Sequence, residues 1–225
     1  TSYPRRTTTG GVWKVTDVAK NLLTEGTWRG SSIPGGRAIF SGGYTGSGYL
    51  NVIDYVTIAT AGNAADFGDL SLGRAAGGVT SSTTRSVVTG GAYQPGGGIV
   101  RVNIIDYVTI SSTGNAADFG DLTAARGDLT GLGNGIRGIT AGGNTPSVVN
   151  IIEYYSIATV GNTVDFGDLT VARYNVGSHN SPTRGLVFGG APATNTIDFM
   201  EIATTGDAVD FGDLATAEHG KACGG

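Results

Sequence analysis

The chain has 225 residues, a formal net charge of −4 and 40 glycines. A mildly acidic chain lacks the clustered basic surface that phosphate binding requires, so we expect no nucleic-acid partner. No stretch approaches the roughly 20 apolar residues that cross a bilayer, and we expect no membrane insertion. The glycines recur at fixed places beside apolar runs, which indicates turns of an ordered fold rather than disorder.

Residues 1–33 differ in pattern from the rest and are interpreted as a lead-in segment. A glycine pair precedes a short apolar run at residues 10–15, which predicts a partial repeat motif. Residues 17–25 break the β pattern and have the caps and spacing of a short helix. That helix either closes one end of the fold or docks a neighbouring subunit, with Trp13 and Trp28 as contact residues.

One unit recurs four times within residues 34–225. Copies of Asp-Phe-Gly-Asp-Leu begin at Asp66, Asp118, Asp165 and Asp210, and glycine pairs that follow apolar runs begin at Gly42, Gly90, Gly142 and Gly189. By either landmark, successive units are 45–52 residues apart. A period of about 50 is typical of β-propeller blades and too long for most helical repeats. The sequence therefore predicts one all-β repeat domain over residues 34–225.

Each unit has the signals of short antiparallel strands. An apolar run closed by two glycines, as in residues 184–190, is typical of a buried strand. Residues 103–110 are rich in β-branched and aromatic residues, and both of their faces are largely apolar, which suits a sheet covered on both sides. Residues 113–115 predict a hairpin turn and residues 117–122 the returning strand. The connector 123–136 is left for a fourth, weaker strand.

Two carboxylates in every copy of the Asp-Phe-Gly-Asp-Leu motif are candidate metal ligands. They are Asp66, Asp69, Asp118, Asp121, Asp165, Asp168, Asp210 and Asp213. Carboxylate oxygens are ligands for Ca²⁺, and a calcium site in each unit is one interpretation. The other, which we adopt, is that they hydrogen-bond nearby backbone amides at a turn. We expect no bound metal.

Arginines also follow the repeat. One series precedes the glycine-pair strand (Arg37, Arg85, Arg137 and Arg184), and a second follows the Asp-rich motif (Arg74, Arg126 and Arg173). Planar guanidinium groups suit bidentate pairing with carboxylates, so we expect Arg–Asp bridges between neighbouring units. The alternative is a positively lined channel for an anionic glycan.

Catalytic chemistry finds little support in the sequence. The two histidines, His179 and His219, belong to no metal-ligand spacing or nucleophile motif. The single Cys223 has no cysteine partner in this chain. We therefore expect no catalytic residue, no cofactor and no enzyme activity.

The loops differ most between units, and binding usually resides in variable loops on a rigid scaffold. The variable segments are residues 44–50, 92–100 and 127–135. Tyr44, Tyr49 and Tyr93 combine an aromatic ring with neighbouring glycines there, which makes them candidate contact residues for a sugar or a protein.

The repeat resembles the kelch repeat. It has an apolar run ending in Gly-Gly, an aromatic residue in the next strand, another aromatic one hairpin later, and then an arginine. Two departures are visible: kelch repeats usually have Trp where these units have Phe67, Phe119, Phe166 and Phe211, and Glu218 stands where the earlier units have arginine. The resemblance implies a kelch-like β-propeller.

The amino-acid sequence of the repeats also resembles that of kelch-like repeats in predicted virion and tail proteins from bacteriophages, including cyanobacterial phages. This resemblance implies a non-enzymatic structural component of a virion, such as a tail, fibre or surface-decorating protein. Its partners would be other virion proteins or copies of itself, with a host surface glycan as a further candidate. The alternative is a secreted or cell-surface propeller that binds carbohydrate.

The chain ends suggest two arrangements. Residues 220–225 match the start of a unit, and residues 8–15 match its glycine pair and next strand. Both ends together would complete a five-unit ring and cover open sheet edges. The other interpretation, which we favour, is that the chain is a segment of a longer protein with more blades.

Overall fold

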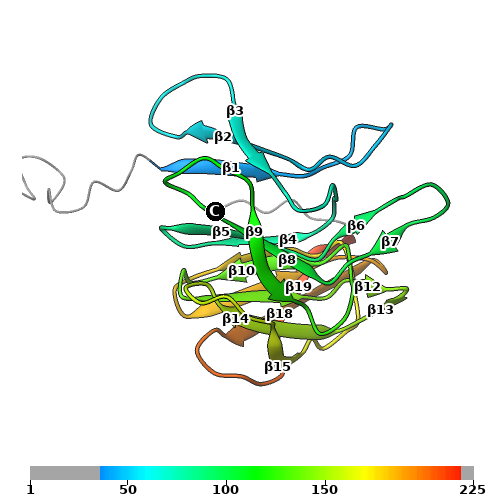
Figure 1. The fold of residues 1–225 in the computed structure, drawn as a ribbon. Coiled ribbons are helices and arrows are strands. Elements are labelled where there is room, and N and C mark those ends of the chain that lie inside the picture. Colours follow the sequence, from blue (N-terminus) through cyan, green and yellow to red (C-terminus); the bar gives the residue numbers. More distant parts are fainter. Residues whose placement is uncertain (1–35, 219–225) are drawn as a thin grey trace, which may run out of the picture. The chain divides into compact units, whose positions relative to one another are not determined.

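The computed structural model describes residues 36–218. The predicted helix at residues 17–25 and the partial repeat motifs at both termini lie outside the described residues. Residues 36–218 are all β, with strands and turns and no helix, which confirms the all-β part of the predicted fold class. They form four antiparallel sheets, here numbered 1 to 4 along the chain, and two small hairpins (Figure 1).

In each sheet, the strands lie side by side in chain order. Sheet 1 contains β1 (Arg37–Ser41), β2 (Val52–Thr57) and β3 (Ala65–Asp69). Sheet 2 contains β4 (Gly78–Ser81), β5 (Arg85–Thr89), β8 (Ile104–Thr109) and β9 (Ala117–Asp121). Sheet 3 contains β10 (Thr130–Gly133), β11 (Arg137–Ala141), β14 (Ile151–Ser156) and β15 (Val164–Asp168). Sheet 4 contains β16 (Gly177–Asn180), β17 (Arg184–Phe188), β18 (Thr194–Glu201) and β19 (Val209–Glu218).

The two small hairpins lie between the second and third long strands of sheets 2 and 3. They are β6 (Ala92–Tyr93) with β7 (Val100–Arg101), and β12 (Asn144–Thr145) with β13 (Ser147–Val148). In Figure 1 both hairpins and the β1–β2 loop leave the sheets on the right of the view. The variable segments at residues 44–50 and 92–100 therefore emerge on the same side of the sheets. The third variable segment, residues 127–135, contains β10, the first strand of sheet 3.

The weak strand expected in each connector is present, and it opens the next sheet. Thr130–Gly133 pairs with the strand Arg137–Ala141 that follows it. Each of sheets 2 to 4 therefore has four strands, and sheet 1 has three in the described part of the chain.

The Asp-Phe-Gly-Asp-Leu motif is a β-bulge. In sheet 2, Ile105 pairs with Gly120 and Asp106 with Asp118, so Phe119 is an extra residue between them. A bulge bends the strand and re-aims a side chain. Here it buries Phe119, whose ring makes an edge-to-face contact with Tyr107 at 5.8 Å. The same register shift occurs in the other three sheets, which explains why the motif recurs.

Successive sheets pack against each other through three separate hydrophobic cores. The core between sheets 1 and 2 contains Phe67, that between sheets 2 and 3 contains Phe119, and that between sheets 3 and 4 contains Phe166. The first strands β4, β10 and β16 also lie close together. Glycine is required at Gly131, because a Cβ there would lie 2.6 Å from the carbonyl oxygen of Val79.

Candidate interaction surfaces

Buried ion pairs join each sheet to the next. The second arginine series pairs with an acid in the third strand of the following sheet: Arg74 Nη1 with Asp106 at 2.8 Å, Arg173 Nη2 with Asp198 at 2.7 Å, and Arg126 with Glu153. All six side chains are at most 1% exposed. The expected Arg–acid bridges between units are confirmed for these three arginines.

The hydroxyl of a Ser or Thr three residues before each arginine binds the same carboxylate as that arginine. The Ser71 hydroxyl donates to Asp106 at 2.7 Å, and the Thr170 hydroxyl donates to Asp198 at 2.6 Å. Thr123 donates to Glu153 in the same way, from its hydroxyl and from its backbone amide. We call this arrangement the acid clamp: a Ser or Thr and an arginine in the connector after one sheet that together hold the acid of the next sheet.

The acid clamps are sensitive to removal of one charge. Burial lowers the pKa of Arg126 and of Arg173, while the neighbouring carboxylates of Glu153 and Asp198 oppose that shift. Arg126 also donates to the carbonyl oxygens of Gly142 and Ile151 at 3.0 and 2.9 Å. A buried charge that loses its partner is strongly destabilising. The clamp arginines are therefore structural, and their burial is incompatible with the expected alternative that they line a glycan channel.

The first arginine series links the sheets in a different way. The Arg85 guanidinium lies 4.6 Å from the centre of the Tyr107 ring and donates to the carbonyl oxygen of Ile157, in the turn after β14, at 3.1 Å. Arg37 and Arg137 make the same two contacts in sheets 1 and 3. In sheet 4, the equivalent Arg184 forms an exposed pair with Glu201 at 2.7 Å.

The backbone of the Asp-Phe-Gly-Asp-Leu motif holds the hairpin turn of the next sheet. Gly114 N donates to the carbonyl oxygen of Phe67 at 2.7 Å, and Ala116 N donates to that of Asp69 at 2.8 Å. In return, Asp69 N donates to the Asn115 side chain at 3.1 Å. We call this set of contacts the turn clasp. It recurs between sheets 2 and 3 and between sheets 3 and 4.

The repeated motif carboxylates differ from the expectation. Asp210 accepts a hydrogen bond from Gly212 N at 3.0 Å, as expected of a turn carboxylate. In the other three copies, the contacts that hold the motif come from its backbone and its phenylalanine. Among residues 36–218, no group of three or more His, Cys, Asp or Glu side chains could hold a metal ion.

The candidate contact tyrosines are only partly brought together. Tyr44 is 57% exposed, and its ring lies 5.0 Å from that of the half-buried Tyr49. Tyr93 is half-buried in the β6–β7 hairpin, a separate loop. Trp13 and Trp28, the other candidate contact residues, lie outside the described residues. The β1–β2 loop therefore presents one aromatic pair, of which Tyr44 is exposed.

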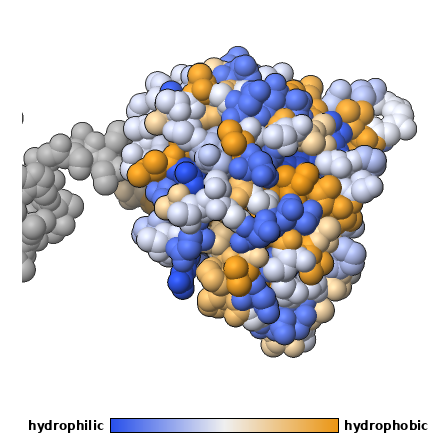
Figure 2. Space-filling view, turned by 90° about the horizontal axis from the view of Figure 1, so that it is seen from below, coloured by the Kyte–Doolittle hydropathy of each residue, from blue (hydrophilic) through white to orange (hydrophobic). Residues whose placement is uncertain are grey.

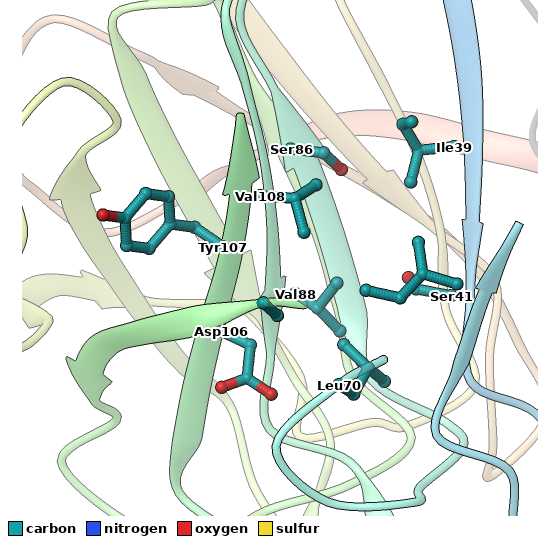
Figure 3. Close-up of a pocket in the computed structure, with 10 residues that line it drawn as sticks. Ile39, Ser41, Leu70, Ser86, Val88, Asp106, Tyr107 and Val108 are labelled. Atoms are coloured by element: carbon teal, nitrogen blue, oxygen red, sulfur yellow. The ribbon is translucent and has the colours of Figure 1, made fainter. Parts of the chain in front are cut away.

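A small cavity lies between sheets 1 and 2. Figure 3 shows Ile39, Leu70, Val88 and Val108 around it, with the carboxylate of Asp106 at its margin. Its volume is about 10 Å³, which is at the lower limit for a single water molecule. A cavity of this size cannot accommodate a metabolite.

The outer face of sheet 4 has the composition of a sheet junction but is open in the described part of the chain. Phe211 is 56% exposed, whereas Phe67, Phe119 and Phe166 are each 2% exposed. The clearest sequence signal for this difference is Glu218, in place of the clamp arginine. Figure 2, which views the described residues from below, shows small hydrophobic patches interspersed with hydrophilic residues.

Comparison of the chain with protein-family models and with curated proteins finds no match. Within the described part, no helix has the length and hydropathy needed to span a bilayer. The fold and the junctions between its sheets are thus the physical basis for a functional proposal.

Proposed function

We propose that the four sheets are blades of a kelch-like β-propeller. Three features support the proposal: the period of about 50 residues, the four-stranded antiparallel meanders, and the close approach of the first strands β4, β10 and β16. In a propeller, short first strands lie around the central axis and successive sheets pack face to face. The hydrophobic cores between successive sheets match that arrangement.

We further propose that the protein is a non-enzymatic structural component of a bacteriophage virion, located in its tail, a fibre or a decorated surface. The observation that carries the proposal is the repetition of the acid clamp and the turn clasp at all three junctions. The buried ion pairs and the repeated backbone contacts join each sheet to the next, which suits a module for assembly or host contact. The assignment to a virion rests on the resemblance of the repeat sequences to kelch-like repeats of phage proteins.

The test is immunogold electron microscopy and immunoblotting of density-gradient fractions from the culture or sample in which the gene occurs. Antibodies against the purified chain should label particles, and the chain should sediment with a capsid protein. A chain that stays in the soluble fraction while the capsid protein sediments would contradict the virion assignment. A pre-immune serum is the control for unspecific labelling.

A secreted or cell-surface carbohydrate-binding propeller is the second candidate. The exposed pair of Tyr44 and Tyr49 favours it, because aromatic rings beside glycines offer a flat apolar surface for a sugar ring. Binding on a glycan array that Tyr44→Ala abolishes would support this function. Phe40→Ala, which removes another exposed aromatic side chain of sheet 1, is the matched control.

A further inference from the structure

The turn between β10 and β11 contains the only Asn-Gly sequence of the chain, Asn134-Gly135. Asn134 Oδ1 accepts a hydrogen bond from Arg137 N at 3.0 Å. In sheets 2 and 4, the hydroxyl of a serine, Ser82 or Ser181, accepts the equivalent bond at the same distance. The turn therefore needs only an oxygen acceptor at this position, and the amide nitrogen of Asn134 is not required to form it.

The residue after Asn134 leaves its backbone nitrogen free to react. The side-chain amide of an asparagine is open to attack by the backbone nitrogen of the next residue, and a glycine hinders this attack least because it has no Cβ. The space where Gly135 would carry a Cβ is open, with only Ser82 Cα at 4.0 Å. Within the described residues, Gly135 N donates no hydrogen bond. No such contact has to break before this nitrogen attacks.

The turn also supplies groups that favour attack on Cγ of Asn134. As the new bond to Cγ forms, negative charge develops on Oδ1. This oxygen already accepts hydrogen bonds from the backbone nitrogens of Ile136 at 3.1 Å and Arg137 at 3.0 Å. Two backbone amides directed at an oxygen where charge develops act as an oxyanion hole, which lowers the barrier for reaction at the carbonyl carbon.

We propose that Asn134 is a site of spontaneous deamidation in the folded chain. Gly135 N gives up its proton to the solvent and bonds to Cγ of Asn134. The bond between Cγ and Nδ2 then breaks, and Nδ2 takes up a proton from water and leaves as ammonia. A water molecule opens the resulting succinimide ring. Opening at Cγ gives aspartate, and opening at the backbone carbonyl carbon gives isoaspartate.

The product alters a contact between sheets 3 and 4. Asn134 Nδ2 donates to the carbonyl oxygen of Pro182, in the turn between β16 and β17, at 3.2 Å. An ionised carboxylate at residue 134 only accepts hydrogen bonds, so it cannot replace this donor. The reaction therefore removes one link between two neighbouring sheets and adds a negative charge to the turn.

The test follows the purified chain at pH 8.5 and 37 °C by digestion and peptide mass spectrometry. The peptide that contains residue 134 should gain one mass unit at least tenfold faster than peptides that contain the other asparagines. An isoaspartate methyltransferase should label the same peptide. The matched control is Asn134→Ser, which reproduces the serine found in the turns of sheets 2 and 4 and should abolish both signals.

A second comparison separates the effect of the turn from that of the Asn-Gly sequence itself. The chain unfolded in guanidinium chloride gives the rate without the oxyanion hole, and conversion in the folded chain should be at least as fast. A rate in the folded chain tenfold below that in the unfolded chain would overturn the proposal. Conversion of Asn134 no faster than that of the other asparagines would overturn it as well.

The effect on the contact between sheets 3 and 4 has its own measurement. Asn134→Asp has the charge of the product and should melt at a lower temperature than Asn134→Ser, which is neutral. Equal melting temperatures would overturn the inferred loss of the link to Pro182. None of these outcomes depends on whether the chain belongs to a virion.

Discussion

Removal of one clamp arginine should destabilise the fold far more than removal of an exposed arginine. Arg126 and Glu153 are at most 1% exposed, and Arg126→Met leaves the Glu153 carboxylate buried without its counter-charge. Breaking a buried ion pair in this way costs about 3–5 kcal/mol of unfolding free energy. The matched control is Arg184→Met: its pair with Glu201 is 56% and 45% exposed, and an exposed pair contributes at most about 1 kcal/mol.

The assay is urea denaturation followed by far-UV circular dichroism, with the unfolding free energies of single and double variants combined in a cycle. Arg126→Met with Glu153→Leu should recover at least about 2 kcal/mol of the loss, because apolar residues can replace a buried pair at little cost. A loss of less than about 1 kcal/mol for Arg126→Met, equal to that for Arg184→Met, would refute the view that the clamps hold the sheets together.

Three further predictions concern stability. Gly120→Ala should lower the unfolding free energy by about 2 kcal/mol more than Gly212→Ala. Both glycines have positive φ, but only Gly120 lies against the next sheet. Equal losses of unfolding free energy in urea titrations would show that the turn clasp does not cause the difference. Burial raises the pKa of Tyr155, whose hydroxyl lies 2.5 Å from Thr80 Oγ1. The unfolded tyrosine therefore loses its proton first, so stability should fall as pH rises above the ordinary tyrosine value of 10. Tyr155→Phe should flatten that fall in melting temperatures measured from pH 8 to 11. Ala76 is exposed with φ of 58°, and Ala76→Asn should raise the unfolding free energy by up to about 1 kcal/mol; a lower melting temperature would contradict the proposed backbone strain.

The repeat period and the alternation of apolar residues were sufficient to predict the all-β class and most strands. The glycine pairs and the Asp-Phe-Gly-Asp-Leu motif mark positions where the backbone itself is constrained, so they repeat visibly. Gly42, for example, has φ of 69°, and a Cβ there would lie 2.3 Å from the carbonyl oxygen of Arg74. Constraints of this kind are local in the chain and can be recognised in one sequence.

The partner of each clamp arginine could not be predicted in the same way. Arg74 lies five residues after Asp69, yet it pairs with Asp106 in the next sheet. Spacing along the chain does not reveal which acid lies across a sheet junction. The exposure of Phe211 could not be predicted from its own motif, which is the same as the motif around the buried Phe119. The sequence signal lies four residues after the motif, where Glu218 replaces the clamp arginine.

We propose that this stack of sheets is part of a virus particle. The most direct measurement is quantitative peptide mass spectrometry of gradient-purified particles, with the chain and the major capsid protein measured against labelled standards. The proposal predicts a constant copy number per particle that survives a high-salt wash. Absence of the chain from washed particles, or a copy number that varies between preparations, would contradict it.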